Sequence, residues 1–263
     1  MTDDKRMSIW GHLAELRRRL TVIVISLLVI TCTAYFFADQ IGIFLLRPAV
    51  PYFENPNNLP YDELVRTTNM LTALEPFTIR FFIAFVTSIV VGSPIWIWQI
   101  LAFFLPALKP NERKWVLPTF FTAILLFLVG VTFCYLIILD PAFEWLLGQA
   151  EGFAVILPST AEYINVILLF EVAFGIAFEL PLVIFYLTVF GIVPYKKLRK
   201  SWRVVYVVLL IVCAMVTPDA SPVTMLLMFA AMAVLYEFSL LFSRVVLAKR
   251  IRALEERARA EGA

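Results

Sequence analysis

The chain has 263 residues, of which 62% are hydrophobic and 16% charged, and its net charge at pH 7 is +2. A soluble domain carries about 25% charged and about 45–50% apolar residues. Here the excess of apolar residues is gathered in runs long enough to cross a hydrocarbon core about 30 Å thick. The composition therefore excludes an ordinary soluble domain. We expect an all-α, polytopic membrane protein, with residues 1–263 forming a single integral membrane domain.

Six apolar runs predict six membrane-spanning helices. The first run follows a charged N-terminal segment and has no small-residue cleavage site after it, which is typical of a retained span and not of a cleaved signal peptide. The fifth run is short, about 20 Å at 1.5 Å per residue, and Pro181 should kink the long fourth run. We therefore expect a bundle that is uneven in depth and concave on one side. The expected spans are residues 20–38, 77–105, 116–139, 164–190, 204–216 and 223–247.

Lysines and arginines predict the orientation of these spans. If the chain crosses the membrane six times, nearly all of the 22 basic residues lie in segments on the same side as the N-terminus. Arg47 and Arg66 lie in a segment on the opposite side. By the positive-inside rule, both termini are then cytoplasmic. The segments 39–76 and 140–163 are long enough to form a cap over the outer face, and Pro48 is one of several prolines that stiffen the first of them.

The sequence carries no signature of an enzyme active site. His12 is the only histidine, and no Walker, HExxH or GxSxG motif accompanies it. Cys32, Cys134 and Cys213 lie far apart in apolar runs, which is typical of small packing residues and not of a disulfide or a metal site. We therefore expect no catalysis, no cofactor and no metal, and an intramembrane hydrolase has almost no residue support.

Three carboxylates fall within the expected spans, where a charge is costly unless it is protonated, paired or in contact with water. Glu237 is within two turns of Arg244 and could simply reach the interface. Glu179 precedes Pro181, where a kink lets water or a partner approach the backbone, and Glu171 could share a wetted face with it. One hypothesis for this pair is a proton-coupled secondary transporter of a small solute.

Apolar residues recur at helical spacing along residues 9–20, which predicts an amphipathic helix at the interface before the first span. The arginines of this segment fit the positive-inside rule. Glu15 does not, since the same surface otherwise selects for cations. Glu112 raises the same question in the next cytoplasmic segment. These two carboxylates require another explanation.

A series of motifs resembles one known family. The stretch His12-Leu13-x-Glu15-Leu16-Arg17-x-Arg19-Leu20 is similar to the N-terminal signature of TatC, the multi-span core of the twin-arginine protein translocase. Further matches follow in the family's order along nearly the whole chain. They are Glu75-Pro76-Phe77, Ser93-Pro94, Gln99, Phe103, Pro106-Ala107-Leu108, Glu112-Arg113-Lys114, Ala173-Phe174-Gly175, Phe178-Glu179-x-Pro181, Thr217-Pro218-Asp219 and Tyr236-Glu237.

The resemblance to TatC implies a six-helix, glove-shaped receptor in the cytoplasmic (inner) membrane of a bacterium or an archaeon. Such a receptor is expected to bind signal peptides with consecutive arginines at its cytoplasmic face. With small single-span partner proteins, it would move folded proteins outward by means of the proton-motive force. The resemblance also implies a complex with several copies of this chain, contacts with membrane lipid and no binding of nucleic acid.

The resemblance assigns the cytoplasmic site to particular residues. Glu15 and Glu112 match the two glutamates that receive the arginine pair, and Phe103 and Leu108 match positions that line the same site. Arg17 belongs to the N-terminal signature and is assigned to this site as well. Since an arginine fork suits a carboxylate better than the point charge of a lysine does, the assignment explains why acids occur on a basic surface.

Other matches lie outside the cytoplasmic site. Glu179 matches the polar residue within the concavity, and Pro48 matches a proline of the outer cap. Thr217 matches part of the polar patch where the small partner helices dock. The family often has a glutamine in this patch, but here the nearest polar side chain is Thr224. No family role extends to Glu171.

Overall fold

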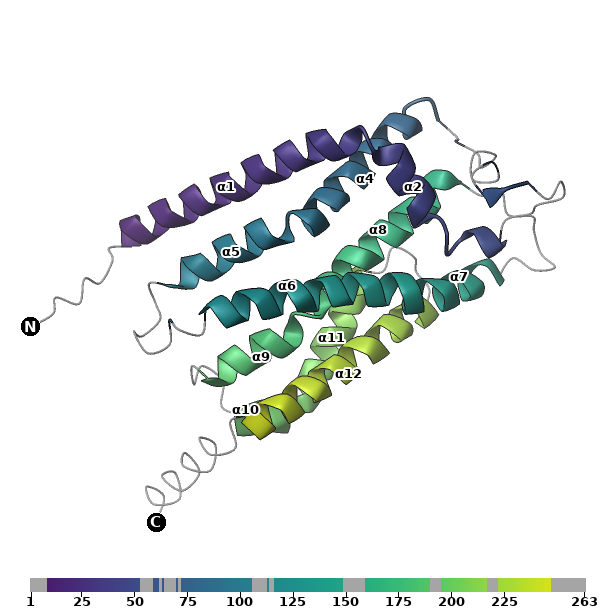
Figure 1. Ribbon diagram of the computed structural model, residues 1–263. Helices are drawn as coiled ribbons and strands as arrows, with labels where there is room; N and C mark the ends of the chain where they lie inside the picture. The colour runs from purple at the N-terminus through teal and green to yellow at the C-terminus, as the bar shows by residue number, and fades with distance from the viewer. Residues whose placement is uncertain are drawn as a thin grey trace, which may run out of the picture. The chain divides into compact units, whose positions relative to one another are not determined.

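The structure, a computed structural model, is built of helices (Figure 1). It describes residues 9–52, 59–61, 63, 70, 72–105, 113, 116–148, 159–189, 195–216 and 222–246. The helices are α1 (Ile9–Tyr35), α2 (Ala38–Leu45), the 3₁₀ turn η1 (Val50–Tyr52), α4 (Glu75–Val91), α5 (Ser93–Phe104), α6 (Val116–Phe133), the π-helical η4 (Cys134–Ile138), α7 (Leu139–Gly148), α8 (Thr160–Ala177), α9 (Leu180–Val189), α10 (Tyr195–Lys200), α11 (Trp202–Val216) and α12 (Pro222–Val246). No strand occurs in these ranges, and the predicted all-α class is confirmed.

Several of these helices are long and apolar enough to cross a membrane. Four do so singly, at Gly11–Tyr35, Val116–Gly148, Thr160–Thr188 and Pro222–Val245. α4 and α5 pass the same test together as a pair bent by 55°, and α11 contains a shorter apolar helix, Trp202–Met215. The predicted polytopic membrane fold is confirmed, and the shorter helix corresponds to the short fifth span expected from the sequence.

Two helices extend beyond the limits expected from the sequence. α1 begins at Ile9, so the amphipathic segment and the first apolar run form one continuous helix, not two. α6 continues through η4 into α7 and ends at Gly148, so that helix enters the segment expected to form part of a cap. A helix satisfies its backbone groups internally and needs no loop residues to do so, which favours this continuation in an apolar stretch.

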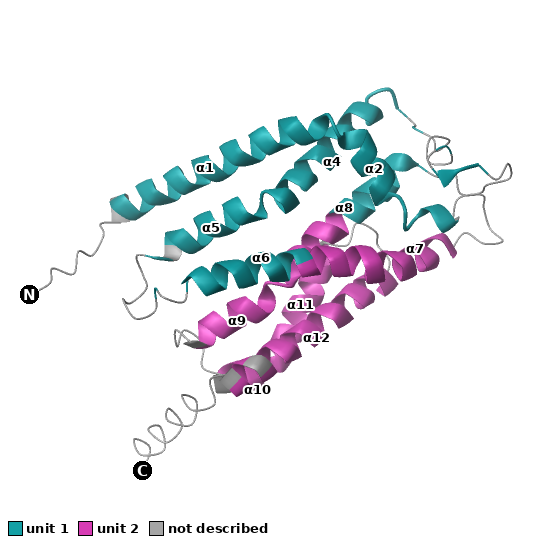
Figure 2. Cartoon of the chain, viewed as in Figure 1, with its two compact units in different colours: residues 1–128, 157–168 teal, residues 129–156, 169–263 magenta. Residues whose placement is uncertain are grey.

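The chain divides into two compact units, coloured separately in Figure 2. Unit 1 comprises residues 1–128 and 157–168, and unit 2 comprises residues 129–156 and 169–263. In unit 1, α1 packs along α4 and α5, and α2 packs against α4. In unit 2, α12 packs against α7, α9, α10 and α11. The single integral membrane domain over the whole chain stays a prediction.

The break between α4 and α5 shapes the part of unit 1 that holds the candidate site. Pro94 has no N–H to donate to the carbonyl of Val90, and this interrupts the helix. A Cβ atom at Gly92 would lie only 3.2 Å from Ile30 Cδ1 of α1 and 2.5 Å from the carbonyl oxygen of Ser88. A glycine is therefore required here, and it lets α1 approach the bend closely.

Two side-chain contacts fasten the segments that the sequence predicts on the outer side. Arg80 of α4 donates from Nε and Nη2 to the two carboxylate oxygens of Asp39 of α2, at 2.8 and 3.1 Å. Ser159 donates its hydroxyl to Glu75 Oε1 at 3.3 Å, which joins the residue before α8 to the first turn of α4. Pro48 is buried in the turn that follows α2. Its role in an outer cap stays a prediction.

Unit 2 contains a close helix contact at Gly130 of α6. A Cβ atom there would lie 2.6 Å from the carbonyl oxygen of Phe174 and 2.8 Å from Cβ of Phe178. Close approach of this kind is how membrane helices gain packing energy when lipid is as apolar as their side chains. Cys134 and Cys213 are fully buried in the same unit and are not joined in a disulfide.

Candidate functional site

A cluster of polar and aromatic side chains lies in unit 1 where the first half of α1 packs against α5. α1 contributes His12, Glu15 and Arg19, whose spacings of three and four residues place them on one helix face. α5 contributes Gln99 and Phe103, which are one helical turn apart. The structure thus places the predicted site residues Glu15 and Phe103 on two helices that pack together, α1 and α5.

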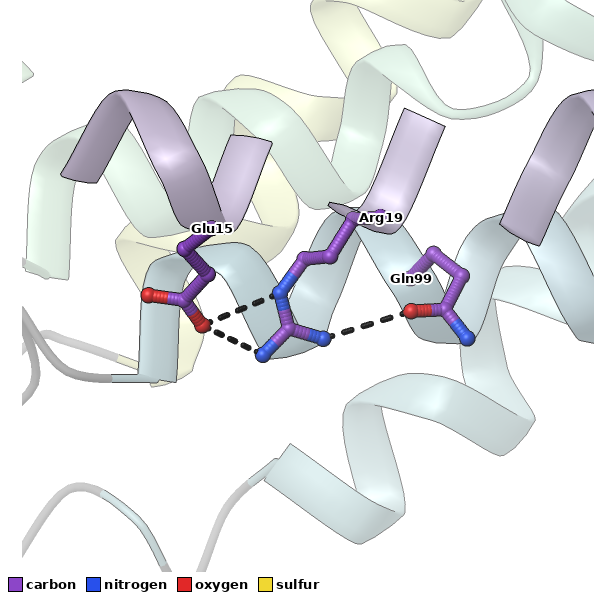
Figure 3. Close-up of polar contacts among 3 residues, drawn as sticks. All are labelled: Glu15, Arg19 and Gln99. Atoms are coloured by element: carbon purple, nitrogen blue, oxygen red, sulfur yellow. Dashed lines mark hydrogen bonds and ion pairs between the residues drawn. The ribbon is translucent and has the colours of Figure 1, made fainter. Parts of the chain in front are cut away.

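Glu15 is paired with Arg19, one turn further along α1 (Figure 3). Arg19 donates from Nε at 3.1 Å and from Nη2 at 2.6 Å, and both bonds go to Glu15 Oε1. Its Nη1 donates to Gln99 Oε1 at 3.3 Å. The Glu15 side chain is 18% exposed and that of Arg19 is 22% exposed. This partial shielding makes the ion pair stronger than a fully solvated one.

The second oxygen of Glu15 has acceptor capacity that the cluster does not use. Oε2 is buried and accepts no hydrogen bond from the part of the chain that the structure describes. An ionised carboxylate has about four acceptor sites on its two oxygens. Because a buried charged oxygen without a donor is unfavourable, the arrangement favours binding of one more cationic or N–H donor at Glu15.

An aromatic contact closes the other end of the cluster. The rings of His12 and Phe103 stack with centroids 4.4 Å apart and an angle of 25° between their planes. His12 therefore has a packing role against a residue that the sequence assigns to the site. Arg17, another predicted site residue on α1, is exposed. Its backbone carbonyl accepts a hydrogen bond from the hydroxyl of Thr21 at 2.9 Å.

Some of the predicted site residues lie outside the described residues. These are Glu112 and Leu108, in the segment between α5 and α6, and Thr217, between α11 and α12. Thr224 is described and is buried in the first turn of α12. Their functional assignments stay predictions.

The two remaining predicted acids both lie in unit 2. Glu171 is in the middle of α8 and is 6% exposed. Glu179 lies in the break between α8 and α9, two residues before the buried Pro181, and its Oε1 is buried without a hydrogen-bond partner among the described residues. The missing N–H of Pro181 accounts for the break. A polar site at this break is compatible with the geometry, and its role stays a prediction.

Glu237 is hydrogen-bonded to residues of two neighbouring helices. Arg199 Nη1 of α10 donates to its Oε2 at 2.6 Å, and the Tyr206 hydroxyl of α11 donates to its Oε1 at 3.1 Å. Tyr236 also ties α12 to α10, because its hydroxyl donates to the carbonyl of Leu198 at 2.9 Å. Glu237 thus fastens three helices of unit 2, and the interpretation that it simply reaches the interface near Arg244 stays a prediction.

A family model described as Sec-independent protein translocase protein (TatC) matches residues 11–230 of the chain. The chain belongs to the TatC family. A TatC protein of Deinococcus radiodurans is 35% identical over 255 residues, which cover 95% of this chain and 90% of that protein. The TatC protein of Aquifex aeolicus is 32% identical over 248 residues, covering 93% of this chain and 98% of the relative.

Solved structures agree with this TatC membership. A crystal structure of a twin arginine translocase receptor, TatC, superposes with a TM-score of 0.76 at 30% identity, over 89% of this chain and 98% of the other. A second TatC receptor structure, in the detergent DDM, superposes with a TM-score of 0.75 at 31% identity and covers 88% of this chain. These likenesses give no support to the solute-transporter alternative.

The sequence assigns no site role to three members of this cluster. These are His12, Arg19 and Gln99, which appear only as letters of the family motifs. The spacing of four residues between Glu15 and Arg19 was a usable signal, because such pairs lie side by side on a helix. No comparable signal could identify Gln99, which is 80 residues away from Arg19 in the chain.

Proposed function

We propose that this chain is the receptor and core component of a twin-arginine translocase. It binds twin-arginine signal peptides at the cytoplasmic face and, with small single-span partners, exports folded proteins by means of the proton-motive force. Membership of a family of protein translocase components supports this function, and the likeness to solved translocase receptors supports the receptor role. In this proposal the chain binds and positions its cargo and performs no covalent chemistry.

The observation that carries the proposal is the partly buried carboxylate of Glu15 with an oxygen to spare. A signal-peptide arginine presents a planar fork of N–H donors, which matches a carboxylate in geometry and in charge. Each charge-assisted hydrogen bond contributes about 1.5–3 kcal/mol when it is shielded from water. A lysine would place one point charge at the same position and lose the second directed bond.

The rest of the cytoplasmic site follows from the family motifs. In the proposal Glu112 receives the second arginine of the pair, because one carboxylate cannot neutralise two adjacent guanidinium groups. Phe103 and Leu108 line the site beside them and shield the ion pairs from water. Arg17, exposed on α1, belongs to the same surface.

The remaining proposed roles concern other parts of the translocase. Glu179, with Glu171 on the preceding helix, forms an intramembrane polar site at the break between α8 and α9. Pro48 shapes the outer cap, and Thr217 and Thr224 take part in docking the single-span partners. Threonine is a chemical type that suits partner docking, since hydroxyl side chains form hydrogen bonds between membrane helices.

The distribution of basic residues supports a location in the cytoplasmic membrane with both termini in the cytoplasm. Six spans are consistent with this arrangement, since an even number returns the C-terminus to the side of the N-terminus. The working complex then contains several copies of this chain together with its partners. The topology is tested by replacing Arg6 or Arg257 with cysteine and labelling the thiol from each side of sealed vesicles. Both positions should be labelled from the cytoplasmic side.

The test of the receptor role is photo-crosslinking of a twin-arginine signal peptide to the membrane-inserted full chain. Replacing both candidate carboxylates, Glu15→Ala with Glu112→Ala, should lower crosslinking by at least about tenfold, because two charge-assisted contacts are lost. Glu144→Ala is the matched control, since it removes an exposed carboxylate from α7. Survival of crosslinking in a double variant that inserts normally would overturn the receptor assignment.

A further inference from the structure

We propose that Arg19 is an internal ligand of Glu15 that a signal-peptide arginine must displace, and that it thereby sets the affinity threshold of the site. This inference rests on the proposed receptor function, because it concerns the same carboxylate. It goes further in assigning a role to Arg19 and Gln99.

The geometry shows that only one carboxylate oxygen of Glu15 is unused. Oε1 already carries two N–H bonds from the guanidinium of Arg19, and Oε2 is buried and carries none from the described residues. A second guanidinium therefore cannot bond to both carboxylate oxygens, as its fork requires, until Arg19 leaves Oε1. Arg19 is the group whose departure frees an acceptor, and it occupies Glu15 with the same functional group that the cargo presents.

The way Arg19 is held makes this exchange feasible. Its link to Glu15 is between neighbours on a single helix, so breaking it separates no two helices. Its other partner, Gln99 on α5, accepts one N–H at the longer distance of 3.3 Å (Figure 3). The neutral amide of Gln99 thus retains the guanidinium of Arg19 within the cluster after the peptide has taken the carboxylate.

Competition by an internal ligand has a definite thermodynamic form. The apparent dissociation constant of a peptide equals its intrinsic value divided by the fraction of molecules in which Glu15 is free. Removing Arg19 should therefore tighten peptide binding, by roughly three- to tenfold for a partly shielded ion pair of this kind. The factor depends only on the Arg19 pair, so it is the same for every peptide that needs Glu15.

An equal gain in affinity for every such peptide distinguishes displacement of Arg19 from a change in the shape of the site. A twin-lysine peptide should gain the same factor as the twin-arginine peptide when Arg19 is removed. The ratio of the two affinities then stays constant while both binding curves shift together. Arg19 sets the intrinsic affinity that a cationic peptide needs in order to bind. The match between a guanidinium fork and the Glu15 carboxylate sets the preference for arginine.

The experiment measures binding of fluorescent twin-arginine and twin-lysine peptides to the full chain in lipid nanodiscs. The variant is Arg19→Gln, and the control is Arg18→Gln, which removes a neighbouring exposed arginine of α1 and so corrects for the loss of one positive charge. We expect both peptides to bind three- to tenfold more tightly than to the control, with an unchanged ratio. Arg19→Lys, which keeps a charge but loses the fork, should give an intermediate affinity.

The inference is overturned if the peptides bind to Arg19→Gln no more tightly than to the control while the thermal midpoint is unchanged. Arg19 would then support Glu15 and not compete for it. A changed ratio between the two peptides overturns it as well. Glu15→Gln in the same assay tests the proposed function separately. If that variant keeps full affinity, the receptor assignment itself fails; if it loses affinity and Arg19→Gln gains none, only the inference fails.

Discussion

Glu15 in unit 1 and Glu237 in unit 2 each lie on an apolar helix and each pair with an arginine. They differ in whether both carboxylate oxygens have a hydrogen-bond donor. At Glu15 both bonds from Arg19 go to one oxygen, and the other oxygen is buried without a donor. At Glu237 one oxygen accepts from Arg199 and the other from Tyr206. The ion pair of Glu237 therefore uses both carboxylate oxygens, whereas that of Glu15 leaves one buried acceptor unused, and the proposed peptide site rests on this difference.

The origin of the partners differs as well. The charged partner of Glu15 comes from its own helix, α1, so it can be exchanged without separating helices. The partners of Glu237, which is on α12, come from α10 and α11. Loss of those contacts loosens three elements of unit 2. The first glutamate is suited to exchange a ligand, and the second is suited to hold a structure.

The largest effect that tests this comparison is expected from reversing the charge of Arg199. Arg199→Glu places two carboxylates together and should destabilise unit 2 by about 1–2 kcal/mol, since the pair is partly exposed and water screens part of the repulsion. The thermal unfolding midpoint of the purified chain measures this loss. Binding of a twin-arginine peptide by the folded protein should change by less than about twofold, because the Arg199–Glu237 pair is no part of the Glu15 cluster.

Two further variants control that experiment. Lys200→Glu makes the same charge change at an exposed position of the same helix and should leave the midpoint nearly unchanged. The exchanged pair, Arg199→Glu with Glu237→Arg, should recover part of the stability. If Arg199→Glu lost peptide binding but kept its full stability, the structural role of the Arg199–Glu237 pair would be contradicted.

A smaller effect is expected from the aromatic contact beside Glu15. His12→Leu removes the stack on Phe103, which contributes about 0.5–1.5 kcal/mol beyond burial. Peptide affinity should fall by about two- to fivefold, because Phe103 is less firmly held at the site. His12→Phe keeps an aromatic ring and should bind as the unaltered chain does. Equal losses in both variants would show that the imidazole itself, and not stacking, supports binding.

The smallest effect is expected when one oxygen of Glu237 is deprived of its donor. Tyr206→Phe leaves Oε1 unpaired and so imitates the state of Glu15, but the Glu237 side chain is 42% exposed. Water should replace the lost hydroxyl, and stability should fall by only about 0.5 kcal/mol. Tyr35→Phe in α1 is the matched control for loss of a phenol in an apolar helix. A loss of several kcal/mol, measured as the thermal midpoint, would show that Glu237 is shielded from water in the membrane.

Much of the fold could be predicted from the sequence because the governing interactions are local. Apolar runs of sufficient length predict helices, and Pro181 predicts the interruption after Ala177 through its missing N–H. The end of the helix that contains α6 and α7 could not be predicted in this way. Asp140-Pro141 is a sequence typical of a helix end, yet the helix continues through it to Gly148.

In the candidate site too, contacts within one helix could be predicted and contacts between helices could not. Glu15 could be predicted because an acid stands out on a surface of cations, and its pairing with Arg19 could be read from a spacing of four residues. Gln99 could not, because it meets Arg19 only through the packing of α5 along α1 below the bend at Gly92. The partners of Glu237 could not be predicted either, because Arg199 and Tyr206 meet it only through the packing of α10 and α11 against α12.

The sequence by itself determined the membrane class, the helices, the family and the carboxylates on which the proposed function rests. These depend on hydrophobicity, on hydrogen bonds within one helix and on motifs, all of which are contained in short stretches of chain. The tertiary structure decided which donors reach each carboxylate and which oxygen is left without one. That outcome depends on how helices far apart in the sequence pack, and packing is a property of all the contacting side chains together.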